Sequence, residues 1–221
     1  MLNWLQTFGS GASGLREINA RFLEMLQDGR HIFDAAANAL LSGGDPEVIR
    51  EDLFRTDARI NQTEQQIRRE IVVHGTIHGA ATFPVLLTMM SLVKDAERVG
   101  DYAKNLFDLA ALRPDMDPAD IAELTAIKDQ VSNLLIRAHG IFKQQEVASA
   151  KEFLEETDGL QNRCDARVEY CIKSADRNRV AEVLAYRYCK RVASHVGNIV
   201  TSVVMPVDKL DYFPNKPMSE Q

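Results

Sequence analysis

The stretch RVGDYAKN, residues 98–105, decides how this chain is organised, because RVASHVGN, residues 191–198, echoes it near the other end. A second pair behaves in the same way: DARINQTE at 57–64 is echoed by DGLQNRCD at 158–165. In each half the acidic stretch comes before the RV stretch. Because two separate motifs keep their order, we expect an internal duplication in which one structural unit is used twice.

Apolar residues recur at helical spacing around these motifs, which predicts an all-α fold of six long helices without strands. Asp45-Pro46 and Asp117-Pro118 are typical of an N-cap followed by a first-turn proline, and they predict the starts of the second and fourth helices. Ser149 with Glu152 resembles a capping box for the fifth helix. The expected helices cover about 15–41, 46–74, 84–112, 118–142, 149–175 and 179–205.

The break at 113–116 divides these helices into two bundles of three. We therefore expect an N-terminal arm with a Gly/Ser tether at 1–14, a first three-helix repeat at 15–112, a second at 117–205 and a C-terminal tail at 206–221. The arm carries large apolar residues, so it either touches a membrane or partner protein or packs on the bundle.

Composition narrows the class of protein. With 45% hydrophobic residues among 221, the chain can bury a sizeable core, and its net charge of −6 argues against a nucleic-acid partner. No run of about 18 apolar residues predicts a membrane span, and no apolar N-terminal run predicts a secretory signal. Together with only three cysteines, this favours a cytoplasmic protein, with peripheral contact at the inner face of the membrane left open.

Acidic residues form stripes on two of the expected helices, because residues four and seven apart return to one face. If these helices are antiparallel neighbours, their oxygens converge and favour a cation such as iron, zinc, manganese or magnesium. Two alternatives remain: solvated helix faces, or neutralisation by Lys104. The stripes are Asp57, Asn61 and Glu64 on the second helix, and Glu97, Asp101 and Asp108 on the third.

The stretch DAERVGDYAKN, residues 95–105, resembles the D-L-E-R-I-G-D-H-A-x-N signature of the PhoU-type phosphate-signalling regulators, and the resemblance extends over nearly the whole chain. It implies two tandem PhoU-like three-helix repeats. It also implies a divalent metal, such as iron or zinc, in the first repeat. The metal ligands implied by the resemblance are Asp57, Glu64, Glu97 and Asp101, with Asn61 as a weaker one.

The sequence departs from that pattern in both halves. Thr82-Phe83-Pro84 stands where the family has an Asp-Leu-Arg segment, and Lys190 and Ser194 stand where the sixth helix should carry Glu and Asp. A lysine beside Asp158 and Asp165 would repel a metal cation. Our hypothesis is that Lys190 takes the place of the metal in the second repeat.

Other potential ligands favour structural interpretations. His74 and His78 lie four apart and could form a two-imidazole metal site, but neighbouring glycines weaken a helix there, which favours a structural or loop role. Cys164, Cys171 and Cys189 form no C-x-x-C pair and are expected to be buried.

The function implied by the resemblance is that of a regulatory adaptor that binds a phosphate transporter component or a sensor kinase and restrains phosphate uptake or signalling. The alternatives are a carboxylate-rich metal storage or oxidase bundle, an accessory subunit of another membrane transporter, and a purely structural scaffold. A homodimer is also left open. No G-x-S-x-G, Walker or dinucleotide motif occurs, so the sequence gives no reason to expect an enzyme.

Overall fold

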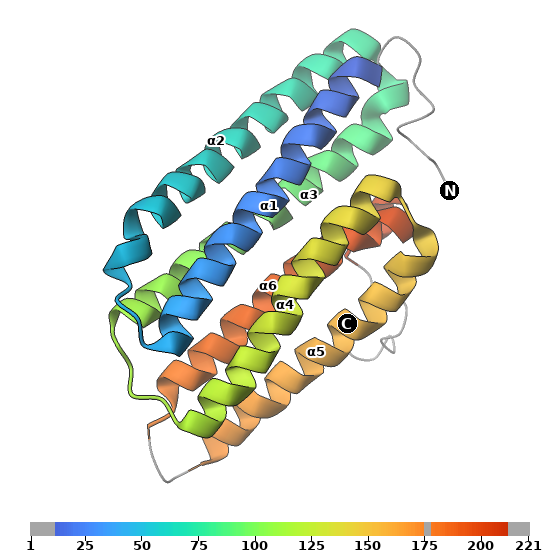
Figure 1. Cartoon of the computed structure of the whole chain (residues 1–221). Coiled ribbons are helices and arrows are strands. Elements are labelled where there is room, and N and C mark those ends of the chain that lie inside the picture. Colours follow the sequence, from blue (N-terminus) through green and yellow to red (C-terminus); the bar gives the residue numbers. More distant parts are fainter. Residues whose placement is uncertain (1–11, 175–177, 212–221) are drawn as a thin grey trace.

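The computed structural model describes residues 12–174 and 178–211. Nearly all of the expected N-terminal arm and most of the expected tail lie outside these residues. The described chain forms six long helices and two short 3-10 turns (Figure 1). The helices are α1 Ala12–Ser42, α2 Glu47–His78, α3 Phe83–Ala111, α4 Pro118–Gln144, α5 Val147–Lys173 and α6 Val180–Val204, and the turns are η1 Ala80–Thr82 and η2 Val207–Lys209.

The six helices pack as two units of three in chain order, with successive helices running in opposite directions (Figure 1). In the first unit α1 packs against α2 and α3, and in the second α6 packs against α4 and α5. The two units meet where α3 lies along α6 and α1 lies along α4. The predicted all-α fold of two tandem three-helix repeats is confirmed.

A single hydrophobic core runs through both units. On α2 the inward stripe of Ile60, Ile67 and Ile71 is at most 5% exposed, as apolar residues at helical spacing predict. Phe22 of α1 and Phe142 of α4 are fully buried, with ring centroids 4.9 Å apart across the junction of the units. Burying an aromatic side chain of this size contributes roughly 2–3 kcal/mol, so this junction is part of the core that holds the fold.

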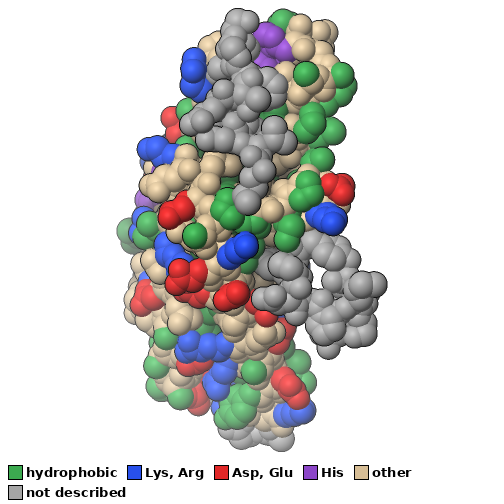
Figure 2. All heavy atoms as spheres, turned by 90° about the vertical axis from the view of Figure 1, so that its right-hand side faces the viewer, with side chains coloured by type: hydrophobic (Ala, Val, Ile, Leu, Met, Phe, Trp, Pro, Cys, Tyr) green, Lys and Arg blue, Asp and Glu red, His purple; other side chains and the backbone are tan. Residues whose placement is uncertain are grey.

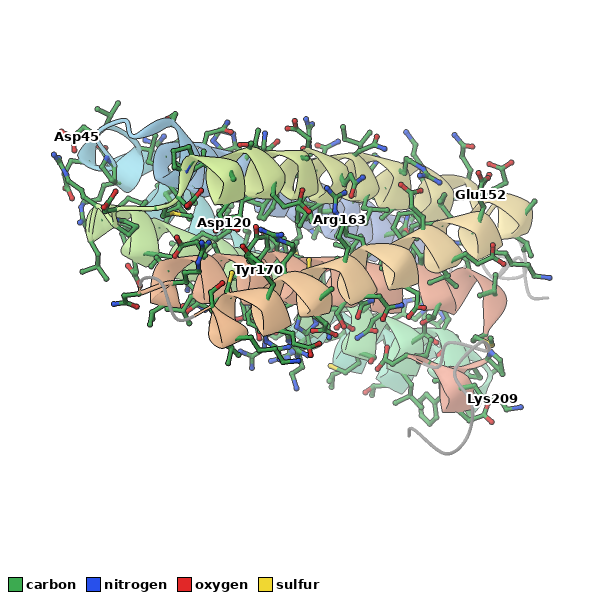
Figure 3. The ribbon with its side chains drawn as sticks, turned by 90° about the horizontal axis from the view of Figure 1, so that it is seen from below. Asp45, Asp120, Glu152, Arg163, Tyr170 and Lys209 are labelled. Carbon is green, nitrogen blue, oxygen red and sulfur yellow. The ribbon has the colours of Figure 1, made fainter. Side chains whose placement is uncertain are left out.

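The helix ends agree with the sequence where an aspartate makes the cap. The Asp117 carboxylate accepts a hydrogen bond of 2.8 Å from the amide of Ala119, and Asp45 accepts one of 3.2 Å from the amide of Glu47. The predicted capping box of the fifth helix is wrong. Helix α5 already begins at Val147, so Ser149 and Glu152 lie inside it, as Figure 3 shows for Glu152.

Helix α2 also continues past the predicted end, through Gly75, as far as His78. A Cβ atom at Gly75 would lie 3.2 Å from Leu86 Cδ1 and 3.3 Å from Phe83 Cε1, so the glycine allows α3 to pack closely on α2. This contact offsets the roughly 1 kcal/mol by which glycine disfavours a helix. The helix ends instead at Gly79, whose φ of 75° suits glycine.

Within residues 12–174 and 178–211, no helix combines the length and the hydropathy needed to cross a lipid bilayer.

Candidate functional site

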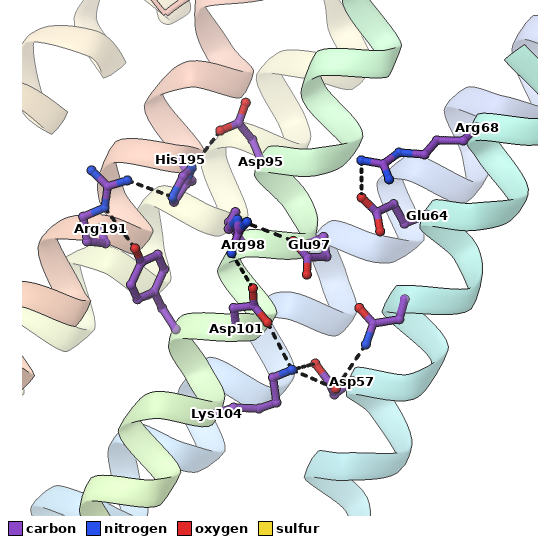
Figure 4. Close-up of polar contacts among 12 residues, drawn as sticks. Asp57, Glu64, Arg68, Asp95, Glu97, Arg98, Asp101, Lys104, Arg191 and His195 are labelled. Carbon is purple, nitrogen blue, oxygen red and sulfur yellow. Dashed lines mark hydrogen bonds and ion pairs between the residues drawn. The ribbon is translucent and has the colours of Figure 1, made fainter.

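The predicted acidic stripes face one another across the α2–α3 contact (Figure 4). Asp57 and Glu64 project from α2 toward Glu97 and Asp101 on α3. The helices approach closely at Gly100, where an added Cβ atom would lie 3.4 Å from Ile60 Cδ1 and 3.6 Å from Asp57 Oδ1. The glycine of the RVGD sequence therefore lets α3 bring its carboxylates to those of α2.

Lys104 provides the positive charge at one end of this site. Its Nζ lies 3.0 Å from Asp57 Oδ1 and 3.1 Å from Asp101 Oδ1, so one ammonium group bridges α2 and α3. Burial disfavours the charged amine, but its hydrogen bonds to Asp57 and Asp101 outweigh burial and raise the pKa of Lys104. Asn61 donates a further hydrogen bond of 3.3 Å from Nδ2 to Asp57 Oδ2. At this end of the site Lys104 neutralises the acidic stripe, as one of the two alternatives from the sequence proposed.

Glu97 lies at the other end, where negative charges accumulate. Burial, followed by the carboxylates of Asp101 and Glu64, raises the pKa of Glu97 to about 7. Arg98 opposes this effect only weakly, since its Nε is 3.8 Å from Glu97 Oε2 and its Nη1 bonds Asp101 at 2.9 Å. Glu64 in turn pairs with Arg68 at 2.7 Å. Near neutral pH, Glu97 therefore takes up or releases a proton.

The structure brings all five predicted metal ligands to one interface, but three of them, Asp57, Glu64 and Asp101, pair closely with lysine or arginine side chains there. Asp108, the last acid of the third-helix stripe, is exposed and lies apart, where its charge acts on Arg50. Among the residues that the structure describes, no three Asp, Glu, His or Cys side chains are arranged to hold a metal ion. A metal would fit only if Lys104 and Arg68 moved away from the carboxylates.

The second repeat presents the matching face between α5 and α6. Asn162 Nδ2 donates to Asp158 Oδ2 at 3.2 Å, repeating the Asn61–Asp57 bond of the first repeat. Lys190 pairs directly with Asp165, and Arg187 joins the same carboxylate at 3.2 Å. Lys190, which was expected to repel a metal cation, is therefore in contact with the carboxylate of Asp165.

One buried polar cluster that the sequence did not reveal joins the two repeats. His195 Nδ1 on α6 lies 2.7 Å from Asp95 Oδ1 on α3, and Asn198 donates to the same oxygen at 3.2 Å. The His195 ring also stacks on Tyr102, with centroids 5.7 Å apart. Asp95 is part of the RVGD signature region, but its partner lies in the other repeat and is visible only in the fold.

A second unpredicted cluster surrounds Asp120, at the start of α4 (Figure 3). This carboxylate is 1% exposed and binds Arg167 of α5, Arg179 and the Tyr186 hydroxyl, the last at 3.0 Å. Tyr170 lies beside both arginines, with its ring centroid 4.7 Å from the Arg167 guanidinium carbon. The cluster ties α4, α5 and α6 together and has no sequence motif.

The remaining predicted side chains have structural positions. The rings of His74 and His78 lie 4.2 Å apart on α2, and burial, with a smaller effect of His78, lowers the pKa of His74. All three cysteines are buried, as expected, and burial raises the pKa of Cys164 to about 12. A thiol with such a pKa is a poor metal ligand at neutral pH.

The fold is a two-repeat helical bundle with paired carboxylate stripes, and comparisons with known proteins find similar ones. The family model for the PhoU domain matches residues 22–110. The crystal structure of PhoU from Pseudomonas aeruginosa superposes with a TM-score of 0.73 at 22% identity, covering 87% of this chain and 96% of that one.

The crystal structure of the phosphate transport system regulatory protein PhoU from Streptococcus pneumoniae gives a TM-score of 0.70 at 17% identity, covering 88% of this chain and 95% of that one. At these identities the two structures establish the fold, while the domain match covers residues of the first repeat. No curated protein sequence matches the chain. The chain is therefore similar to PhoU proteins in two respects: residues 22–110 match the PhoU domain model, and the fold of the whole bundle matches the two PhoU structures.

Proposed function

We propose that this protein is a cytoplasmic regulatory adaptor that restrains phosphate uptake or phosphate-responsive signalling by binding a transporter component or its sensor kinase. The observation that carries the proposal is the PhoU domain at residues 22–110. The similarity of the whole bundle to the phosphate transport system regulatory protein of S. pneumoniae supports it. Long helical bundles present extended faces to partners, which suits regulation by protein contact.

Capture of partners from cells tests this function. The tagged full-length protein is purified from phosphate-replete and phosphate-starved cells, and the copurified proteins are identified. We expect a phosphate transporter subunit or a sensor kinase to be enriched in the replete sample, and we expect phosphate uptake to rise when the gene is deleted. If the deletion instead changes the uptake of a different solute, the protein is an accessory subunit of another transporter. Sedimentation of the purified protein tests the homodimer that the sequence leaves open.

A divalent metal in the first repeat is a second candidate, supported by the convergence of Glu64, Glu97 and Asp101 that raises the pKa of Glu97. Iron or zinc would have to compete there with Lys104 and Arg68. Metal content after purification without chelator, and the melting shift on adding each metal, test this role. A parent protein that retains no more metal than an Asp101→Asn, Glu97→Gln variant would contradict it.

A further inference from the structure

The end of the α2–α3 hairpin is free of formal charge over an unusual length. Residues 71–93 contain no Asp, Glu, Lys or Arg, although such residues make up 26% of the chain. His74 and His78 are the only titratable residues in this range. The segment includes the end of α2, the turn η1 and the start of α3, so the uncharged residues converge on one tip of the bundle.

Large apolar side chains on this tip are open to solvent. Their exposed fractions range from 49% to 69%, whereas exposed apolar residues are usually scattered singly over a protein surface. Hydrophobic side chains gather toward the upper end of the molecule in Figure 2, where Figure 1 places the end of α2 and the start of α3. The tip residues are Val72, Val73, Ile77, Phe83 and Leu87.

Exposed cations lie behind this apolar tip. Arg69 precedes Ile77 by two helical turns and Lys94 follows Phe83 by three, which places them roughly 12 Å and 16 Å from those residues along their helices. Arg16 lies in the first turns of α1, two residues after Gly14, whose added Cβ atom would lie 3.0 Å from His74 Nδ1.

These cations are available to an external anion. All three are exposed, and within the part of the chain that the structure describes none of them forms an ion pair. The neighbouring acids Glu17 and Glu70 both pair with Arg21, at 2.5 Å and 3.3 Å. The rim of the tip, Arg16, Arg69 and Lys94, is therefore positively charged.

We propose that the α2–α3 tip inserts into the surface of a bilayer containing anionic phospholipids, with the apolar residues at the acyl boundary and the cationic rim among the headgroups. Interfacial protein segments bury their apolar faces by about 5–10 Å, which is less than the roughly 12 Å along the helix between Ile77 and Arg69, so the apolar residues can be inserted while Arg69 stays among the headgroups. The shape favours lipid over a protein partner, because helix-binding partners fit grooves or stripes along a helix, whereas these residues form a protruding end of two helices.

Vesicle flotation tests the proposal with the full-length protein. One set of vesicles contains phosphatidylcholine with 30% phosphatidylglycerol, and the other phosphatidylcholine alone. We expect the parent to bind the anionic vesicles and a tip variant, Ile77→Glu with Leu87→Glu, to lose about tenfold or more in affinity, since a charge replaces each inserted side chain. The matched control, Leu112→Glu with Ile172→Glu, changes two equally exposed residues elsewhere and should bind like the parent.

The rim is tested separately by Arg69→Ala with Lys94→Ala. Each lost cation should lower the affinity for anionic vesicles by about fivefold, with no change on neutral ones. The proposal is overturned if the parent floats with neither vesicle, if it binds both equally, or if the tip variant binds like the control. Binding that appears only after deletion of residues 1–11 also overturns it, because the chain's own N-terminal segment would then cover the tip. None of these outcomes depends on which protein the bundle regulates.

Discussion

The two repeats place different charges at matched positions of the same frame. In the alignment of RVGDYAKN with RVASHVGN, Glu97 corresponds to Lys190, and Glu64 corresponds to Asp165 in the other aligned pair. In the first repeat, carboxylate faces carboxylate, and the pKa of Glu97 rises to about 7. In the second, the ammonium of Lys190 contacts the carboxylate of Asp165.

One acid–amide hydrogen bond is repeated on the matching helices of the two repeats. The Asn61–Asp57 and Asn162–Asp158 hydrogen bonds, at 3.3 Å and 3.2 Å, occupy the same places on α2 and α5. Replacement of Glu97 by Lys190 and of Asp101 by Ser194 on the facing helix therefore accompanies the change from a face with a raised carboxyl pKa to one in which a lysine pairs with the acid. The duplicated units have kept their architecture while their chemistry diverged.

The largest expected effect lies in the buried charges of the second repeat. Asp120→Ala removes the carboxylate shared by Arg167, Arg179 and Tyr186, and we expect it to lower the free energy of unfolding by about 3–5 kcal/mol. Urea denaturation followed by circular dichroism measures this. Asp129→Ala, at an exposed ion pair, is the control and should change stability by less than about 0.5 kcal/mol. Equal effects of the two would show that the cluster does not stabilise the fold.

The second effect is a pH dependence specific to the first repeat. Because the pKa of Glu97 is raised from 4.5 to about 7 in the folded protein, folded Glu97 holds a proton that the unfolded chain has released, and stability falls as pH rises through this window. Glu97→Gln should remove this loss, with a gain of about 3 kcal/mol at pH 8 and little change at pH 4.

Denaturation of the parent and the Glu97→Gln variant across that pH range measures the difference. The exposed Glu51→Gln is the control, with no expected change. The comparison between repeats is sharpened by Lys190→Gln, which should destabilise the protein at both pH values because it removes an attraction. A gain from Glu97→Gln that is equal at pH 4 and pH 8 would refute the raised pKa.

A smaller effect is expected where Lys104 bridges the α2–α3 site. Lys104→Met leaves Asp57 and Asp101 facing one another without their ammonium group and should cost about 1–2 kcal/mol of stability. It should also strengthen zinc or manganese binding, since a metal no longer competes with the lysine. Calorimetric titration of parent and variant measures the affinity, and Lys173→Met, at an exposed pair, is the control. Unchanged metal affinity would show that Lys104 does not compete with a metal ion for Asp57 and Asp101.

Lys190→Glu with Ser194→Asp should have the smallest effect on stability. This variant gives the second repeat the acidic residues that the first repeat has at the matching positions. The Lys190–Asp165 pair is partly exposed, so its loss should cost about 1 kcal/mol or less. The variant should retain more zinc or manganese after gel filtration than both the parent and a Lys190→Met, Ser194→Ala control. If it binds no more metal than the parent, Lys190 has not replaced a metal in this repeat.

The sequence predicted those features that depend on neighbours along one helix. Apolar spacing gave six helices, Asp117-Pro118 gave the start of α4, and the four-residue spacing put Asp57 and Asn61 on one face. It also identified Lys104 as an alternative cation, because Asp101 lies three residues away on the same helix.

The features that it missed depend on contacts between helices. Gly75 was expected to weaken α2, but packing of Leu86 and Phe83 against the glycine compensates. His195 had no visible partner, because Asp95 lies in the other repeat. Asp120 gave no signal, since its two arginines come from different parts of the chain. Helical periodicity carries no information about which faces of distant helices meet.

The contact of α3 with α6 resembles the interface of a two-fold symmetric dimer, because matching helices of the two repeats pack on each other within one chain. Asp95 of α3 corresponds in the repeat alignment to Tyr188 of α6, and His195 corresponds to Tyr102. The Asp95–His195 pair thus has a symmetry mate in Tyr102 and Tyr188, whose ring centroids lie 6.1 Å apart. A homodimer would have to place the same pair on both sides of its axis. Fusion of the two units in one polypeptide has allowed an acid–imidazole contact on one side and an aromatic contact on the other.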